Sequence, residues 1–370
     1  MFKRYLLIII CLIALLPVPG HTVSPAPQLT LNPYAGVSWQ NQHRANFHAH
    51  TVLSDGVLSP RQVIDAYHQR GYKILALTDH DTKGPPDTTW PWHVHGRDPE
   101  TLGMLPIEGN ELSHHDHVLS LFNSHSSMKG DSLETSLKAI GERDGLAILC
   151  HPGRYKEPRQ WASYMPYFLR HPHLVGIEVY NQGDRYPGDR ELWDRLLTVL
   201  MPDRPVWGFS NDDLHRASQL GRNWNNILVS ELSERSVRDA LIGGEFYITH
   251  QPGKEPAPEI TKILTDEAGL TIRANNYTEI RWVSEGKIIH RGETLDYQRH
   301  PGVGVYVRAE VEGKGGVVLT NPFGFQISGR PLSVDQPAMA SEQAGTAPDL
   351  SRLLLIVVVS LVVMLLIIRR

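Results

Sequence analysis

Residues 45–50 read Ala-Asn-Phe-His-Ala-His, a short apolar stretch that ends in two histidines. In an extended strand, residues two apart point to the same side, so His48 and His50 can reach one metal ion. A helix would place the two imidazoles about 200° apart around its axis. Residues 213–215 repeat this spacing, with the carboxylate of Asp213 in place of one imidazole and His215 as the other. Both segments therefore predict metal ligands at the ends of strands.

The same combination of an apolar run and a metal-type ligand recurs along the chain. Asp55 follows the first histidine pair, and four further runs end in carboxylates or imidazoles. These further ligands are Asp79-His80-Asp81, Glu111 with His117, His151, and Glu178. One such cluster would be weak support for a site, but the series predicts a multinuclear metal site that many elements of one domain build together.

The body of the chain alternates short apolar runs with amphipathic helical patterns, which predicts an α/β fold with a parallel sheet or barrel. Nearly every ligand cluster lies at the carboxyl end of an expected strand, where such folds place their active sites. We expect strands at residues 45–50, 73–78, 105–108, 118–122, 146–150, 175–180, 206–210 and 227–229. We expect helices at residues 59–71, 132–143, 157–170, 189–200 and 233–242.

The pattern changes after His250. Residues 252–258 are typical of a linker, and residues 258–328 contain β-type runs without a convincing helix. This pattern predicts a small all-β domain. Its histidines are His290 and His300, and we assign no chemistry to it.

Composition limits the classes of function. The chain has 370 residues, with 36 Lys and Arg against 40 Asp and Glu, and a net charge of -4. Nothing in this balance attracts nucleic acid as a whole, so no stable nucleic-acid partner is expected. Only two cysteines occur, Cys11 and Cys150, which excludes a disulfide framework.

Two apolar segments bracket the chain. A basic start and a short apolar run predict a signal peptide at residues 1–20, with an uncleaved anchor as the alternative. Residues 353–368 are apolar and flanked by arginines, which predicts a C-terminal transmembrane helix after a flexible spacer at residues 330–352. By the positive-inside rule, these segments predict a membrane-anchored protein whose catalytic domain is extracytoplasmic, in a bacterial periplasm or outside the cell.

Four motifs together resemble the PHP family, the polymerase and histidinol phosphatase domain. They are His48-Ala49-His50-Thr51 with Ser54-Asp55-Gly56, Leu77-Thr78-Asp79-His80-Asp81, Cys150-His151-Pro152-Gly153, and Asp213-Leu214-His215. The resemblance implies a distorted (βα)7 barrel over residues 40–250, followed by the small β domain at residues 258–328. It also implies a centre of two or three divalent metal ions that hydrolyses phosphoester bonds.

The resemblance implies a role for nine positions of this sequence. One metal would be held by His48, His50, Glu111 and Asp213, and a second by Glu111, His117 and His151. A third would be held by Asp55, His80 and His215. His117 competes with its neighbours His114, His115 and His125, and we favour it because residues 118–122 read as the strand that follows this ligand.

Hydrolysis of a phosphoester needs an activated nucleophile and compensation of the developing charge. Two metals with a bridging carboxylate such as Glu111 supply a hydroxide at neutral pH, and Asp213 shares this catalytic centre. Mixed imidazole and carboxylate ligands suit Mn, Zn or Fe. Arg154 is the candidate for binding the substrate's phosphate, and Arg216 is a second candidate.

Residues beside the predicted ligands are given supporting roles. Asp79, Glu178 and Asp212 are expected to accept hydrogen bonds from the ligand imidazoles. Cys150 is expected to be a buried strand residue whose side chain points away from that of His151.

The leading hypothesis is a metal-dependent phosphoesterase that acts on a small phosphorylated substrate, either a phosphomonoester or a phosphodiester. A carbamate or carboxylic ester hydrolase is an alternative, because the same centre can attack a carbonyl group. A non-catalytic metal-binding envelope module is a third. The predicted partners are the substrate and, through the C-terminal helix, a membrane.

Overall fold

The computed structural model of this protein describes residues 26–81, 90–267 and 269–328. The predicted signal peptide, spacer and transmembrane helix lie outside these residues. The predicted membrane localisation is corrected by the structure, because no helix in the described ranges is long and apolar enough to cross a bilayer. The longest of them has 12 residues, whereas a span needs about 20. The same finding leaves the predicted membrane partner without support.

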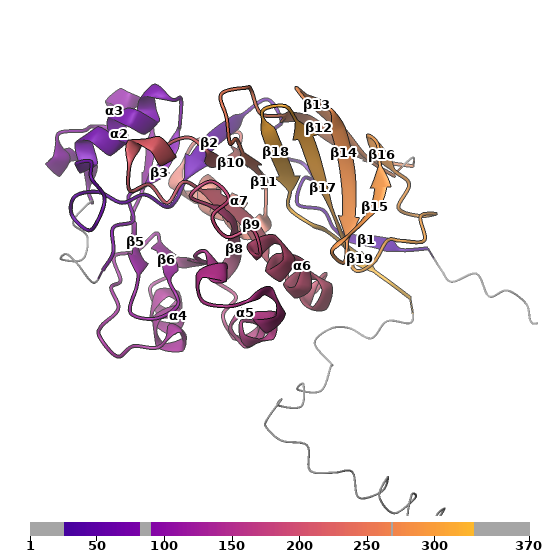
Figure 1. Ribbon diagram of the computed structural model, residues 1–370, viewed down its shortest axis with the longest axis horizontal. Helices are drawn as coiled ribbons and strands as arrows, with labels where there is room; N and C mark the ends of the chain where they lie inside the picture. The colour runs from indigo at the N-terminus through magenta and orange to yellow at the C-terminus, as the bar shows by residue number, and fades with distance from the viewer. Residues whose placement is uncertain (1–25, 82–89, 268, 329–370) are drawn as a thin grey trace, which may run out of the picture. The chain divides into compact units, whose positions relative to one another are not determined.

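Figure 1 shows how the elements of the described chain are arranged. The α-helices are α2 (Pro60–Gln69), α3 (Pro99–Leu102), α4 (Leu133–Glu142), α5 (Met165–Arg170), α6 (Asp189–Leu200) and α7 (Glu234–Gly243). The 3-10 helices are η1 (Trp92–His95), η2 (Pro152–Arg154), η3 (Pro158–Ser163) and η4 (Ala217–Gln219). The strands of the first part are β1 (Gln28–Leu31), β2 (Gln42–Asn46), β3 (Ile74–Ala76), β4 (Leu105–Ile107), β5 (Gly109–Leu112), β6 (Val118–Leu121), β7 (Leu146–Leu149), β8 (Leu174–Asn181), β9 (Trp207–Asn211), β10 (Asn223–Leu228) and β11 (Phe246–His250). The later strands are β12 (Glu259–Asp266), β13 (Gly269–Asn275), β14 (Glu279–Ser284), β15 (Lys287–Arg291), β16 (Thr294–Leu295), β17 (Tyr306–Gly313), β18 (Gly316–Thr320) and β19 (Phe323–Gln326).

Helix α2 shows how local sequence sets an element boundary. The Ser59 side chain accepts a hydrogen bond from the N–H of Gln62, and Pro60 occupies the first helical position, as predicted. Pro60, Val63, Ile64 and Tyr67 are the buried residues of the helix. Val63, Ile64 and Tyr67 share a buried cluster with Leu75 of β3, so α2 packs beside that strand.

The strands that lead to the predicted ligands belong to two sheets. In one sheet β2, β3 and β4 run parallel, and β10 and β11 add antiparallel strands on the other side of β2. The other sheet has the order β5-β6-β7-β8-β9, with β7, β8 and β9 parallel and β6 antiparallel to both neighbours. The α/β class is therefore confirmed.

The distorted (βα)7 barrel that the resemblance implies does not close in the described residues, because the two sheets are not joined by a continuous backbone ladder. Between β9 and β10 the Asn225 side chain takes the place of a strand pair: its Oδ1 accepts from the N–H of Ser210 at 3.1 Å and its Nδ2 donates to the Ser210 carbonyl at 3.0 Å. Single backbone bridges between the sheets join Ala49 to Leu214 and His80 to Glu111. Both bridges lie at predicted ligands or beside them, so the sheets meet where the site is.

The region from β12 to β19 consists of antiparallel strands and lies on the right of Figure 1. Its core contains Trp282, Ile272 and Phe323, all fully buried. Strand β18 pairs with β11, so one sheet runs through residues on both sides of the predicted linker. The predicted domain boundaries stay predictions.

Some elements differ from the expected ones. The helix expected at residues 157–170 is the 3-10 helix η3 followed by α5, with Pro158 and Pro166 in their first turns. Strand β5 follows β4 after a single residue, and nothing in its short sequence Gly-Asn-Glu-Leu distinguishes it from a loop. The helices expected at residues 132–143, 189–200 and 233–242 agree closely with α4, α6 and α7.

Candidate metal centre

The structure brings all nine predicted ligands together at the junction of the two sheets. Six of them have relative exposures below 10%: His48, His50, Glu111, His117, His151 and Asp213. His80 and His215 are partly exposed, and Asp55 reaches the cluster from the turn before α2. The ligand atoms fall into four overlapping groups, each within 4.8 Å. The groups are His48, His50 and Asp213; His48, Glu111, Cys150 and His151; His80, Glu111 and His117; and His50, Asp55, His80 and His215.

The pair of histidines that opens the sequence pattern has the expected geometry. Strand β2 ends at Asn46, but Ala49 still bridges to Leu214, and its side chain is buried away from the cluster of imidazoles. His48 Nε2 lies 3.1 Å from His50 Nε2. Both imidazoles therefore point into the same space, as residues two apart in extended backbone should.

Glu111 lies at the centre of the cluster. Its Oε1 accepts hydrogen bonds from His117 Nδ1 at 2.9 Å and His151 Nε2 at 3.2 Å. Its Oε2 lies 2.9 Å from His80 Nδ1 and 3.3 Å from the Nε2 atoms of both His48 and His50, yet none of these contacts is a well-directed hydrogen bond. Burial would raise the pKa of this carboxyl, but the charge of His48 and the hydrogen bonds from the imidazoles hold the pKa well below its ordinary value.

Asp213 repeats this arrangement beside the first histidine pair. Its Oδ1 lies 3.0 Å from His50 Nε2 and 3.4 Å from His48 Nε2, and it too has no well-directed hydrogen bond. Buried carboxylate oxygens are normally satisfied, because an unpaired one costs free energy. Two unsatisfied oxygens that face imidazole nitrogens are what a divalent metal between them would explain. The residues present therefore fit a cluster that holds divalent metal ions.

Exposure increases from the inside of the cluster to the outside. The side chains of His48, His50 and Glu111 are at most 1% exposed, whereas those of His215 and Asp55 are 24% and 31% exposed. The neighbouring carboxylates of Asp55 and Glu111 favour the protonated imidazole of His80, outweigh the effect of burial and raise its pKa to about 9. The distribution of the nine side chains over two or three ions stays a prediction.

Of the three predicted supporting carboxylates, only Glu178 contacts a ligand imidazole. Its Oε1 accepts from His48 Nδ1 at 2.9 Å and its Oε2 from the backbone N–H of His151 at 3.0 Å. The role predicted for Asp79 is wrong, because it accepts from the backbone and hydroxyl of Thr51. Asp212 likewise accepts from Tyr67 and from the backbone of residues 221–223.

The prediction for Cys150 is only half right. The side chain is buried, as expected, but its sulfur joins the group with His48, Glu111 and His151. Strand β7 ends at Leu149, and His151 has a φ of 28°, so the alternation of a strand no longer applies there. Local backbone conformation, not sequence spacing, decides where this thiol points.

The competing histidines lie outside these groups. His115 bonds to the Asp116 carbonyl and the Ser136 hydroxyl, and none of the four groups includes His114 or His125. His117 is therefore the member of its sequence neighbourhood that reaches Glu111.

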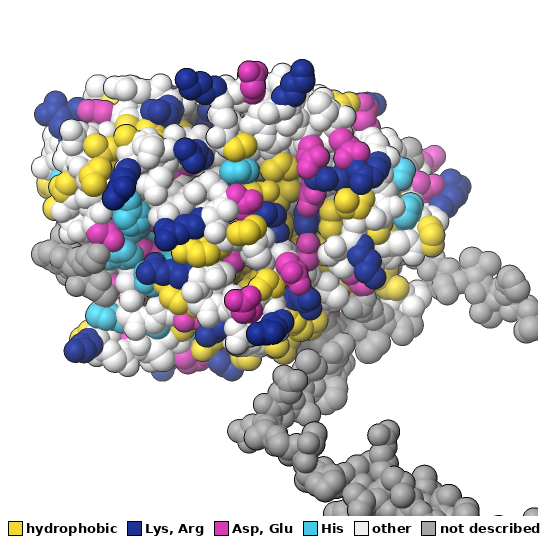
Figure 2. Space-filling model, viewed as in Figure 1, with side chains coloured by type: hydrophobic (Ala, Val, Ile, Leu, Met, Phe, Trp, Pro, Cys, Tyr) yellow, Lys and Arg dark blue, Asp and Glu magenta, His cyan; other side chains and the backbone are white. Residues whose placement is uncertain are grey.

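A pocket of about 400 Å³ opens over the cluster. Histidines gather on the left of the face drawn in Figure 2, with Lys and Arg side chains around them. Arg154 lines this pocket, as its predicted role requires, and Arg216 is absent from the lining. Sequence reasoning missed Gln182, Arg185 and Tyr186, which also line it. Only their position could have indicated them, because they directly follow strand β8, which carries the buried Glu178.

Comparisons with known proteins agree with this architecture. No protein-family model matches the chain. It is 28% identical to an uncharacterized protein of Methanocaldococcus jannaschii over 122 residues, which cover 30% of this chain and 67% of that protein. It is 30% identical to a 5′-3′ exoribonuclease of Haemophilus influenzae over 108 residues, which cover 28% of this chain and 37% of the exoribonuclease. The match thus spans little more than a third of the exoribonuclease.

One solved structure resembles most of the chain. It is a two-domain protein from Bacteroides vulgatus that contains a predicted PHP-like metal-dependent phosphoesterase, with a TM-score of 0.50 and 16% identity. The likeness covers 81% of this chain and 90% of that protein, which is more than residues 40–250 alone could supply. The chain therefore shares the fold of a protein with a PHP-like region and a second domain.

Proposed function

We propose that this protein is a metal-dependent phosphoesterase of the PHP type. The observation that carries the proposal is the pair of buried carboxylate oxygens, Glu111 Oε2 and Asp213 Oδ1, which face imidazole nitrogens without a hydrogen bond. The shared fold with a protein that contains a PHP-like phosphoesterase supports it. The proposal includes a metal-activated hydroxide as the nucleophile, and a phosphomonoester or a phosphodiester as the substrate.

The donor set indicates which residues would hold the metal ions. Imidazoles from His48, His50, His80, His117, His151 and His215 combine with carboxylates from Asp55, Glu111 and Asp213. This mixture suits Mn, Zn or Fe. Divalent ions, when bound, supply Lewis-acid polarisation of the phosphoester and a nucleophile at neutral pH.

Two further residues would support the reaction: Glu178 would orient a metal ligand, and Arg154 would bind the substrate's phosphate. Glu178 accepts from His48 Nδ1 and so directs its Nε2 toward Glu111 and Asp213. Arg154 is exposed at the pocket, its guanidinium lies over the Tyr155 ring, and no carboxylate of the described residues forms an ion pair with it. A free guanidinium beside the cluster can form two parallel hydrogen bonds to a phosphate group.

A second candidate is hydrolysis at the end of a short oligonucleotide. Tyr186 lines the pocket, and its ring centroid lies about 6 Å from that of His151, where it could stack against a base. The short similarity to an exoribonuclease points the same way.

A substrate panel tests these functions. The purified full chain, loaded with Mn²⁺ or Zn²⁺, would be assayed on an aryl phosphate, a bis-aryl phosphate, a 5′-phosphorylated dinucleotide and an aryl carbamate. We expect turnover of at least one phosphoester. Turnover of the carbamate alone would replace the proposal with the ester hydrolase alternative, and metal binding without turnover would favour a non-catalytic module.

Arg154→Ala sharpens the phosphate assignment. Loss of a charge-assisted contact should lower kcat/KM by roughly 10- to 100-fold, mainly through KM. The matched control is Arg216→Ala, which removes an exposed guanidinium that does not line the pocket. Equal effects of the two substitutions would contradict a specific role for Arg154.

A further inference from the structure

Three neighbouring strand ends at the pocket adopt a left-handed backbone at residues other than glycine. His151 after β7 has a φ of 28°, Gln182 after β8 has 46°, and Asp213 after β9 has 45°. Such a conformation is unfavourable for a residue with a Cβ and persists where the surroundings impose it, often at functional sites. His151 and Asp213 are predicted ligands, whereas nothing has yet been assigned to Gln182.

The side chain of Gln182 is held at both ends of its amide. Its Oε1 accepts a hydrogen bond from Arg185 Nη1 at 2.6 Å, and its Nε2 donates to Asp213 Oδ2 at 3.0 Å. A guanidinium can only donate, so the amide oxygen must face Arg185 and the amide nitrogen must face Asp213. The amide group that faces Asp213 is therefore the NH₂, which has no free lone pair to offer a metal ion.

The bond to Gln182 distinguishes the two oxygens of Asp213. With Oδ2 engaged by the amide, Oδ1 is the oxygen that lies near His50 Nε2 and His48 Nε2 without a directed hydrogen bond. Arg185, which holds the amide, also lines the pocket. The chain thus connects an arginine at the pocket to a predicted ligand through one side chain.

We propose that Gln182 is a positioning residue that holds the Asp213 carboxylate with Oδ1 directed into the metal cluster, and that Arg185 fixes the Gln182 amide. This inference rests on the proposed function, because it gives Asp213 the role of a ligand. In this proposal, the unfavourable left-handed backbone at Gln182 is what places its amide beside Asp213.

The test separates positioning from a general structural role. Gln182→Gly removes the amide and also relieves the left-handed backbone, since glycine adopts positive φ without a clash. The metal-free variant should therefore unfold at the same temperature as the wild type or higher. Its affinity for Mn²⁺, measured by calorimetric titration, should fall roughly 10- to 100-fold, and kcat should fall more than KM rises.

Two further variants complete the experiment. Gln182→Glu keeps an acceptor for Arg185 but replaces the donor to Asp213 with an oxygen, so its Mn²⁺ affinity should also fall. Asn276→Gly is the matched control, because Asn276, between β13 and β14, also has a left-handed backbone, with a φ of 57°. It should preserve or raise the unfolding temperature and leave Mn²⁺ affinity unchanged.

Opposite outcomes would overturn the inference. Unchanged or tighter Mn²⁺ binding by Gln182→Gly or Gln182→Glu, with the wild type binding normally, refutes the positioning role alone. Failure of the wild type itself to bind Mn²⁺, Zn²⁺ or Fe²⁺ refutes the proposed function instead. If Gln182→Gly loses affinity and unfolds at a clearly lower temperature, its role is structural and the proposal is wrong.

Discussion

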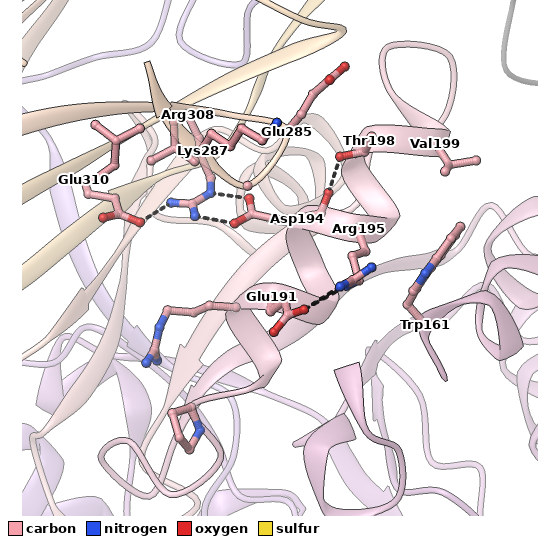
Figure 3. A pocket seen from close by; sticks show the side chains of 15 residues that line it. Trp161, Glu191, Asp194, Arg195, Thr198, Val199, Glu285, Lys287, Arg308 and Glu310 are labelled. Atoms are coloured by element: carbon pink, nitrogen blue, oxygen red, sulfur yellow. Dashed lines mark hydrogen bonds and ion pairs between the residues drawn. The ribbon is translucent and has the colours of Figure 1, made fainter. Parts of the chain in front are cut away.

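The candidate metal centre and the groove between α6 and the β14–β15 hairpin are both lined by charged side chains, but their buried carboxylates differ. The groove is the larger cavity, about 760 Å³ against 400 Å³. Figure 3 shows the Asp194 carboxylate of α6 beside the Arg308 guanidinium of β17. Asp194 Oδ1 accepts from Tyr306 and Arg308 at 2.7 and 2.8 Å, and Oδ2 accepts from Arg308 at 2.7 Å.

Cavity size and buried charge do not identify a site by themselves. Every oxygen of Asp194 is bonded within the protein, so the charge is compensated and nothing further is required. Glu111 and Asp213 each keep an unsatisfied oxygen that faces imidazoles. Unsatisfied ligand atoms thus distinguish the candidate metal centre from the structural ion pair.

The largest effect is expected from Glu111→Gln. Loss of the central carboxylate should remove bound metal and lower activity by about a thousandfold or more, or ~4 kcal/mol. Metal content and turnover would be measured on the same sample. The control is Glu310→Gln, which alters a carboxylate bonded to Arg308 in the groove and should leave metal content unchanged. Full activity of the Glu111 variant would show that the unsatisfied oxygen of Glu111 does not mark a catalytic metal centre.

The next effect concerns stability at the groove. Arg308→Met should lower the free energy of unfolding by about 3–5 kcal/mol, because Asp194 would be left buried without its partner. Adding Asp194→Leu should restore most of that stability, since no unpaired charge remains. Denaturant titrations of the two variants would measure this. If Arg308→Met alone is as stable as the double variant, the charge of Asp194 does not depend on Arg308 for compensation.

A smaller effect is expected at Asp189, which connects the two regions through α6. Its Oδ1 accepts from the N–H of Gly153 at 2.6 Å, beside Arg154. Burial raises the pKa of this carboxyl from an ordinary 3.8 to about 8, against the lowering effect of that hydrogen bond. Because the folded pKa lies above the unfolded one, the carboxyl's contribution to stability is complete below pH 4 and is lost as the pH rises through about 8.

Asp189→Asn tests this pH dependence. The neutral amide can still accept from Gly153, so the variant should match the wild type near pH 4 and unfold about 2 °C or more above it at pH 8. Asp184→Asn is the control, as it removes a surface carboxylate paired with Arg190. A difference between variant and wild type that does not grow with pH would contradict the buried, neutral carboxyl.

The smallest effect should come from the rim of the groove. Glu191 and Arg195 form an exposed ion pair one helical turn apart on α6. Glu191→Gln should change the free energy of unfolding by less than about 0.5 kcal/mol, with no effect on metal binding. A loss above 1 kcal/mol, measured by denaturant titration, would show that the groove depends on its surface charges.

Local patterns predicted the cluster of nine side chains because each predicted ligand lies at or near the end of a short apolar run. The spacing of His48 and His50 needs only extended backbone, and the caps of α2 lie in adjacent residues. The alternation of strands and helices predicted the α/β class in the same way.

Features that depend on distant contacts could not be predicted. The open seam between the sheets depends on the amide of Asn225 reaching Ser210 from another strand. Asp79 and Asp212 bond to loops whose proximity only the fold determines. Gln182 and Cys150 owe their directions to left-handed backbone at residues 182 and 151, which the sequence does not reveal.

Metal content is the most direct test of the central claim. The metal-free full chain would be equilibrated with Mn²⁺, Zn²⁺ or Fe²⁺, separated from free ions, and measured by elemental analysis. The cluster of nine side chains predicts at least two ions retained per chain for one of these metals. Retention of none of them would show that the unsatisfied oxygens of Glu111 and Asp213 do not mark a metal centre.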